Sequence, residues 1–142
     1  MTYVLDASTL LRFTDKGPGY DRVRDLFYDA AKGKTQLFLS AVNWGEVVTV
    51  LYRKNSRNAE TLLGNLAALP INIVAVDAPA AAIAGKFKWS FNVPYPDAFA
   101  GALTLHQSNA NQEAEPATLL TADYDFKNVP KGTIRIEFLP AK

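Results

Sequence analysis

The sequence predicts a three-layer α/β/α sandwich built on a mostly parallel central sheet of about five strands. Two observations carry this prediction. Short runs of β-forming residues alternate along the chain with longer segments of helical pattern. Most of the short runs are apolar throughout, which is typical of parallel strands that are covered on both faces. Strands separated by helices require crossover connections, and these crossovers place helices on the faces of the sheet.

Five strands are expected, at residues 2–5, 36–39, 71–76, 117–120 and 133–138. The first four are mostly apolar, so we expect both of their faces to be buried. In the last, apolar and charged residues alternate from Ile134 to Phe138. This alternation predicts an edge strand with one face in water.

Helices are expected near residues 20–32, 41–54, 58–68, 78–89 and 97–108. Gly33 ends the first, while Ser40 and Asp77 are the expected N-caps of the second and fourth. Two prolines precede the last helix. The polar stretch at 108–116 is rich in small residues and predicts a surface loop.

Length and composition narrow the class of protein. A chain of 142 residues is most simply one domain, here residues 1–142. Its 15 Lys and Arg against 14 Asp and Glu exclude a general attraction to nucleic acid or membrane, so polyanion binding would be local. The absence of cysteine excludes disulfides and zinc–thiolate sites. The N-terminal run lacks the features of a signal peptide and no stretch could span a membrane, so we expect a cytoplasmic protein with no membrane partner.

At four places an acid, or a pair of acids, interrupts a long uncharged stretch that is rich in apolar residues. The acids are Asp6, Glu46, Asp97 and the pair Asp123 and Asp125. A carboxylate in apolar surroundings is costly unless it is paired, hydrogen-bonded or bound to a metal. The repeated pattern therefore calls for one shared explanation.

The predicted topology brings these acids together. Functional groups of an open parallel sheet gather beyond the carboxyl ends of its strands. Asp6 and the pair Asp123 and Asp125 directly follow strands, and Asp97 opens a helix. Glu46 lies on the apolar face of its helix rather than on a wet stripe. We expect all of these acids to point into one cleft.

Converging carboxylates repel one another unless a cation lies between them. Oxygen ligands without His or Cys favour Mg²⁺ or Mn²⁺ over zinc. The cluster therefore predicts a divalent-metal site, and the natural partner of such a site is a phosphate group.

Four segments of the chain resemble the successive motifs of the PIN-domain family, in particular the VapC-like toxins of bacterial and archaeal toxin–antitoxin pairs. The segments are VLDASTLL, SAVNWGEVVTVL, YPDAFAGALT and LLTADYDF. They extend from the first expected strand to Phe126 and carry the acids in the family order. The stretch between the third and fourth motifs is longer than is usual in the family. This difference leaves the motifs intact and affects the shape expected for one rim of the cleft.

The resemblance implies a role for each matching residue. The acidic quartet that holds Mg²⁺ or Mn²⁺ would be Asp6, Glu46, Asp97 and Asp123. Asp125 would be an accessory acid, and the hydroxyls of Ser8 and Thr121 would hydrogen-bond within the site. We expect Asp6 and Asp97 to bind the metal directly, Asp123 to bind it directly or through water, and Glu46 to orient a water molecule or act as a base.

The activity that the resemblance implies is metal-dependent endoribonuclease cleavage of RNA, leaving a 5′-phosphate and a 3′-hydroxyl. It also implies the toxin of a VapBC-type pair, a cognate antitoxin as partner and a homodimer.

Each acid has a local alternative. Asp6 could cap a helix, and Asp97 could interact with a helix dipole. The pair after the fourth expected strand could be turn residues, and Glu46 could form an ion pair with Arg53. Ser8 and Thr121 could hydrogen-bond only to nearby backbone.

Three alternative functions also remain at the level of sequence. The chain could be an RNA-processing nuclease that is not a toxin, or a binding module that has lost its chemistry. It could also be a small-molecule phosphatase, although Ser8 stands where the D-x-D motif of haloacid-dehalogenase-like enzymes has its second aspartate. His106, the single histidine, is expected at the surface or an interface rather than in the site.

Overall fold

The computed structural model describes residues 1–110 and 115–142. Its sheet has the strand order β3-β2-β1-β4-β5, and every neighbouring pair is parallel. The strands are β1 (Thr2–Leu5), β2 (Gln36–Ser40), β3 (Asn72–Val74), β4 (Thr118–Thr121) and β5 (Arg135–Phe138). The helices are α1 (Ala7–Thr14), α2 (Tyr20–Ala31), α3 (Ala41–Ala67), α4 (Ala78–Phe91), α5 (Tyr95–Ala110) and the 3₁₀ helix η1 (Tyr124–Asn128).

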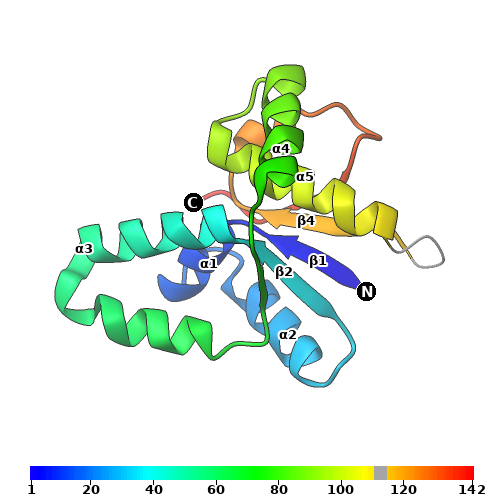
Figure 1. Ribbon diagram of the computed structural model, residues 1–142. Helices are drawn as coiled ribbons and strands as arrows, with labels where there is room; N and C mark the ends of the chain where they lie inside the picture. Colours follow the sequence, from blue (N-terminus) through cyan, green and yellow to red (C-terminus); the bar gives the residue numbers. More distant parts are fainter. Residues whose placement is uncertain (111–114) are drawn as a thin grey trace.

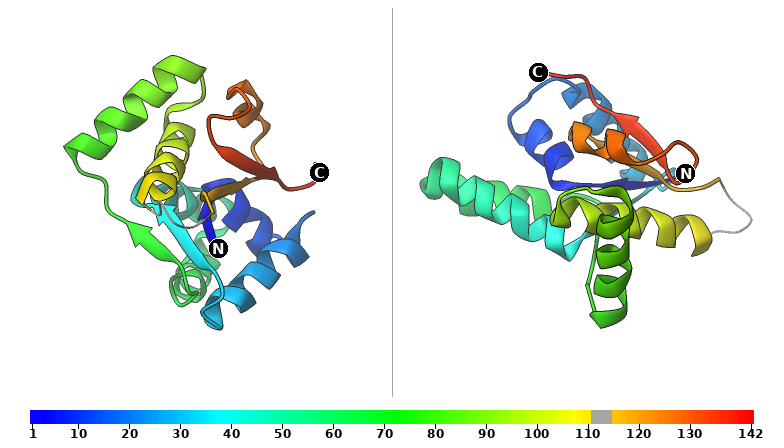
Figure 2. Two further views of the ribbon diagram at one scale, coloured as in Figure 1. Left: turned by 90° about the vertical axis from the view of Figure 1, so that its right-hand side faces the viewer. Right: turned by 90° about the horizontal axis from the view of Figure 1, so that it is seen from above.

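Helices cover both faces of the sheet (Figures 1 and 2) and enclose two hydrophobic cores. In β1, Tyr3 and Leu5 belong to the core under α1, α2 and α3, whereas Val4 belongs to the core under α4 and α5. Neighbouring residues of β4 divide in the same way, with Leu120 in the first core and Leu119 in the second. The predicted three-layer fold is confirmed, and the uninterrupted apolar runs of these strands are explained by burial on two sides.

The third expected strand differs from the prediction. Its ladder is reduced to Asn72–Val74, and Asn72 and Ile73 are exposed, so the expectation that both faces would be buried is wrong. The reason is topological, because β3 pairs only with β2 and lies at one edge of the sheet. The sequence run is apolar, but an edge position leaves it fewer neighbours. At the opposite edge lies β5, as its alternation predicts.

The second and third expected helices form one element, α3, with a break at Asn55 (φ −160°, ψ 88°). Figure 1 shows its two arms on either side of this bend. The Asn55 side chain accepts a hydrogen bond from the backbone N–H of Asn58 at 3.4 Å, which caps the second arm.

Two other elements differ from the predicted boundaries. α1 is not among the five expected helices, and the sequence indicates it only through the alternative that Asp6 caps a helix. The first three residues of the predicted loop at 108–116 belong to α5, which continues to Ala110, and residues 111–114 lie outside the described residues. No helix in the described part of the chain is both long and apolar enough to cross a membrane.

The packing of α4 on α5 depends on Gly101. A Cβ at this position would overlap the ring of Phe87, which is buried and packs edge-on against Phe91. We expect Gly101→Ala to lower the free energy of unfolding by about 1–3 kcal/mol, measured by urea unfolding. Gly64→Ala in α3 is the control, because a Cβ there meets no atom within 4 Å, and it is expected to be neutral or slightly stabilising. Equal destabilisation by both variants would contradict this assignment.

Candidate metal centre

The parallel pairing of β1 and β4 brings two acidic loops together. Leu5 pairs with Leu120, so the residues that follow both strands leave the sheet at the same end, beyond the carboxyl ends of the strands. Asp6 is the N-cap of α1 and Asp123 is the N-cap of η1. Both acids therefore have the local roles of the alternative interpretation, and the sheet also places them side by side.

Asp6 is held by hydrogen bonds on both carboxylate oxygens. It is 2% exposed, and its Oδ1 accepts from Ser8 Oγ at 2.6 Å, from the Thr9 backbone N–H at 3.1 Å and from Thr9 Oγ1 at 3.2 Å. Its Oδ2 accepts from Thr121 Oγ1. Burial raises the pKa of Asp6 above its ordinary value, and these four hydrogen bonds oppose that rise. The result is a buried carboxylate with a fixed orientation.

The same hydroxyls join the two loops to each other. Thr121 Oγ1 accepts from the backbone N–H of Asp123 at 2.9 Å while it donates to Asp6. Ser8 Oγ accepts from the backbone N–H of Ala122 at 2.9 Å. Ser8 and Thr121 thus bond across the two loops, Thr121 also bonds to the nearby backbone of Asp123, and together they fix Asp6 relative to Asp123.

Glu46 reaches this edge from the first turns of α3, which begins at the N-cap Ser40. Glu46 is half-buried, and its Oε1 accepts from Asn43 Nδ2 at 2.8 Å. The pKa of Glu46 is raised, first by burial and then by the charges of Asp6 and Asp123. The alternative of an ion pair with Arg53 is not observed among the residues described.

Asp97 lies in the first turn of α5 and is 7% exposed. Its Oδ2 is buried and has no hydrogen-bond partner. Burial raises the pKa of Asp97 to about 9, with further contributions from a hydrogen bond with Asp123 and from the charges of Asp123, Asp6 and Glu46. The first turn of a helix favours an ionised acid, but burial among other acids has the larger effect on the pKa of Asp97 and favours its neutral form.

The carboxylates of Asp97, Asp123 and Asp125 each offer an oxygen, and these oxygens lie within 4.8 Å of one another. Asp125 is exposed, and its backbone N–H donates to Asp123 Oδ1 at 2.9 Å. Asp6 and Glu46 are not part of this trio, but their charges act on Asp97. The structure thus brings all five predicted acids together near the carboxyl ends of the strands, with Asp125 in the trio around Asp97.

The donor set fits a divalent cation. Every candidate ligand atom is a carboxylate oxygen, and in residues 1–110 and 115–142 none of the five acids forms an ion pair with Lys or Arg. A hard cation such as Mg²⁺ or Mn²⁺ would satisfy these clustered carboxylates, two of which are buried, and the unpartnered Oδ2 of Asp97.

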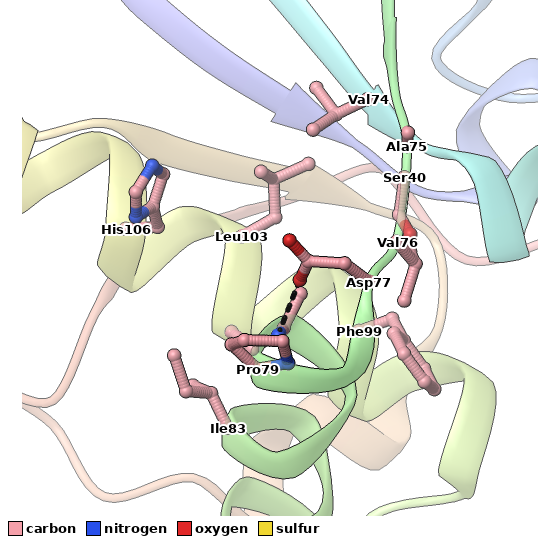
Figure 3. Close-up of a pocket in the computed structure, with 12 residues that line it drawn as sticks. Ser40, Val74, Ala75, Val76, Asp77, Pro79, Ile83, Phe99, Leu103 and His106 are labelled. Carbon is pink, nitrogen blue, oxygen red and sulfur yellow. Dashed lines mark hydrogen bonds between the residues drawn. The ribbon is translucent and has the colours of Figure 1, made fainter.

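The groove in Figure 3 lies elsewhere, between the loop after β3 and helices α4 and α5. Its volume is about 360 Å³, its lining is mostly apolar, and it contains none of the five clustered acids. Asp77 lines it, but this side chain already caps α4 through the Ala80 backbone N–H at 2.9 Å. His106 is exposed at its rim and takes no part in the acidic cluster.

The model of the PIN domain family matches residues 3–132 of the sequence. The chain belongs to the PIN domain family. Among proteins with curated functions, none matches this PIN domain significantly in sequence.

Solved structures share the PIN fold over nearly the whole chain. VapBC2 from Rickettsia felis, bound to a DNA fragment from its promoter, has a TM-score of 0.70 at 17% identity, covering 99% of this chain and 100% of that one. VapC20 from Mycobacterium tuberculosis, described as a Sarcin-Ricin loop cleaving toxin, has a TM-score of 0.66 at 16% identity and covers 95% and 99%. DNA-bound VapBC from Salmonella typhimurium has a TM-score of 0.66 at 18% identity and covers 97% and 98%.

Proposed function

We propose that this PIN domain is a Mg²⁺- or Mn²⁺-dependent endoribonuclease and the toxin of a VapBC-type pair. The observation that carries the proposal is the cluster of carboxylates near the carboxyl ends of β1 and β4, in which Asp6 and Asp97 are buried and no acid has a basic partner among the residues described. The likeness in fold to a toxin that is described as cleaving the Sarcin-Ricin loop supports RNA as the substrate class.

The residues have separate tasks in this proposal. When bound, the cation supplies Lewis acidity, which lowers the pKa of water and stabilises charge on the phosphate. Asp6, Asp97 and Asp123 hold the cation, with Asp125 beside them. Ser8 and Thr121 keep Asp6 in place through their hydroxyls.

Glu46 handles the proton in this scheme. Its Oε1 is engaged by Asn43, which leaves Oε2 to orient the attacking water and accept its proton. The water oxygen forms a new bond to phosphorus while the bond from phosphorus to the 3′ oxygen breaks, and the departing 3′ oxygen takes a proton from solvent. The products are a 5′-phosphate and a 3′-hydroxyl.

The proposal extends to partners. Several structures with this fold are described as toxin–antitoxin complexes, which supports a cognate antitoxin. An antitoxin arginine would compete well for the acids, because its planar guanidinium pairs with carboxylates through two hydrogen bonds. A homodimer, action as one domain over residues 1–142 and a cytoplasmic location belong to the same proposal.

The test compares two helix-capping aspartates. Asp6 caps α1 and Asp77 caps α4, and each accepts from a backbone N–H three residues on. Asparagine caps helices about as well as aspartate, so neither Asp→Asn variant should lose its cap. We expect Asp6→Asn to weaken Mn²⁺ binding in isothermal titration and to lower RNA cleavage at least about 100-fold, while Asp77→Asn changes neither.

Three results would count against the proposal. Cleavage by Asp6→Asn at the wild-type rate would remove the assigned site. Hydrolysis of phosphomonoesters without RNA cleavage would favour a phosphatase, and Mn²⁺ binding without any cleavage would favour a binding module.

A further inference from the structure

Asn43 is fully buried (0% exposed) in the first turn of α3, where its side chain hydrogen-bonds to an acid of its own helix and to the first turn of α5. Its Nδ2 donates to Glu46 Oε1 at 2.8 Å and to the backbone carbonyl of Pro96 at 3.0 Å. Pro96 directly precedes Asp97 at the start of α5. One amide group therefore contacts both the Glu46 carboxylate and the turn that carries Asp97.

The orientation of this amide is fixed by its neighbours. A flipped side chain would turn Oδ1 toward Glu46 Oε1 and the Pro96 carbonyl, which are both acceptors and would repel it. The observed orientation leaves Asn43 Oδ1 buried and without a partner. Asp97 Oδ2 is the other buried side-chain atom without a partner in the described part of the chain.

Each of these two unsatisfied acceptors needs a donor, because buried polar atoms are otherwise paired. Water molecules in the coordination shell of a divalent cation are donors, and Mg²⁺ usually keeps several of them. The unpartnered Oδ2 of Asp97, which belongs to the acidic trio, is an acceptor that such a water could satisfy.

The bond from Asn43 to Pro96 has a second consequence. Within residues 1–110 and 115–142 it is the one hydrogen bond between α3 and α5. Glu46 and Asp97 repel each other and belong to these two helices. The amide opposes that repulsion, because it holds the acid of α3 and the first turn of α5 at a fixed separation.

We propose that Asn43 is a positioning residue that fixes Glu46 relative to Asp97 and thereby sets the affinity of the acidic cluster for a divalent cation. The inference rests on the cation-binding part of the proposed function and not on the identity of the substrate. It gives Asn43 a role comparable to that of Ser8 and Thr121, which hold Asp6 in place.

The first experiment compares Asn43→Ala with Asn72→Ala in the full 142-residue chain. Asn72 is a matched control, because its Nδ2 donates to a backbone carbonyl, that of Leu37, at 3.0 Å in a bond between β3 and β2. We expect Asn43→Ala to raise the Mn²⁺ dissociation constant at least about tenfold, measured by isothermal titration, and Asn72→Ala to leave it unchanged. Equal Mn²⁺ affinity in Asn43→Ala and wild type would overturn the proposal.

A double-mutant cycle separates positioning from a general loss of stability. If Asn43 acts through Glu46, then Glu46→Gln should weaken Mn²⁺ binding clearly in the wild-type background and much less in Asn43→Ala. A purely structural role for Asn43 predicts additive effects, and additivity would reject the proposal.

A measurement on the wild-type protein covers the case in which Asn43→Ala does not fold. The side-chain amide signals of Asn43 in a ¹⁵N-correlated NMR spectrum should shift during a Mg²⁺ titration and saturate together with binding, while those of Asn72 stay in place. An unmoved Asn43 signal would overturn the inference.

The two proposals can fail separately. Mn²⁺ binding that depends on Asn43, without RNA cleavage, would overturn the nuclease function alone. No Mn²⁺ binding by the wild type would overturn both.

Discussion

Asp97→Asn is expected to lower metal-dependent RNA cleavage by about two to three orders of magnitude and, in metal-free buffer at pH 7, to make the protein more stable. The loss of activity follows because the substitution removes a charged oxygen from the trio formed with Asp123 and Asp125. Asparagine keeps the size of the side chain, so the backbone of α5 need not move.

The gain in stability has an electrostatic cause. Burial and neighbouring acids raise the pKa of Asp97 from its ordinary 3.8 to about 9. At pH 7 Asp97 ionises in the unfolded chain, which lowers the free energy of the unfolded state. In the folded chain without a cation this carboxyl stays protonated, so the folded state has no such gain in free energy. Each unit between the ordinary pKa and the pH corresponds to about 1.4 kcal/mol, so after relaxation of the site we expect a gain of about 2 kcal/mol. Thermal and urea unfolding in EDTA measure it.

Asp15→Asn is the control for this variant, since Asp15 is exposed, pairs with Lys54 at 3.0 Å and lies outside the cluster. It should leave both cleavage and stability nearly unchanged. If Asp97→Asn instead lost stability together with activity, Asp97 would be a structural residue of α5, and its role in a metal site would lose its main support.

The fold could be predicted because burial on two sides leaves a readable pattern. Val4 and Leu5 enter different cores, so β1 must be apolar at successive positions, and a polar residue there would be buried on one face or the other. The same signal failed at β3, because an apolar run carries no information about whether its strand is central or at an edge. The break of α3 at Asn55 did leave a signal, because two separate helices are expected at residues 41–54 and 58–68, and Asn55 lies between them.

The acids of the site could be found from sequence because each is an isolated charge among apolar residues, as Asp6 is beside β1. Asn43 carried no such signal. Its importance comes from two hydrogen bonds, and one of them reaches Pro96 across 53 positions of the chain. Ser8 and Thr121, which also orient an acid, could be proposed from sequence only because they match positions of the family motifs.

Stability of the metal-free protein is expected to fall as the pH rises from about 5 to about 9, by roughly 1 kcal/mol per pH unit. The sign follows from Asp97, whose pKa of about 9 in the folded state lies above its ordinary 3.8. Between these two values the folded protein binds more protons than the unfolded chain, so raising the pH favours unfolding. The raised pKa values of Asp6 and Glu46 act in the same direction.

A saturating divalent cation should change this pH dependence, because a cation binds the ionised carboxylates and releases their protons. Its stabilising effect must then grow with pH, and the stability curve in Mg²⁺ should separate from the curve in EDTA as the pH rises. Urea unfolding at several pH values between about 5 and 9, with Mg²⁺ and with EDTA, measures both curves. The stability of the Asp97→Asn variant in EDTA should depend less on pH, because the variant lacks the carboxyl group whose pKa is raised to about 9 in the folded protein. Parallel curves in Mg²⁺ and EDTA would mean that the stabilising effect of the cation does not depend on pH. The cation would then not bind through these acids, because a protonated carboxyl group must lose its proton to bind it.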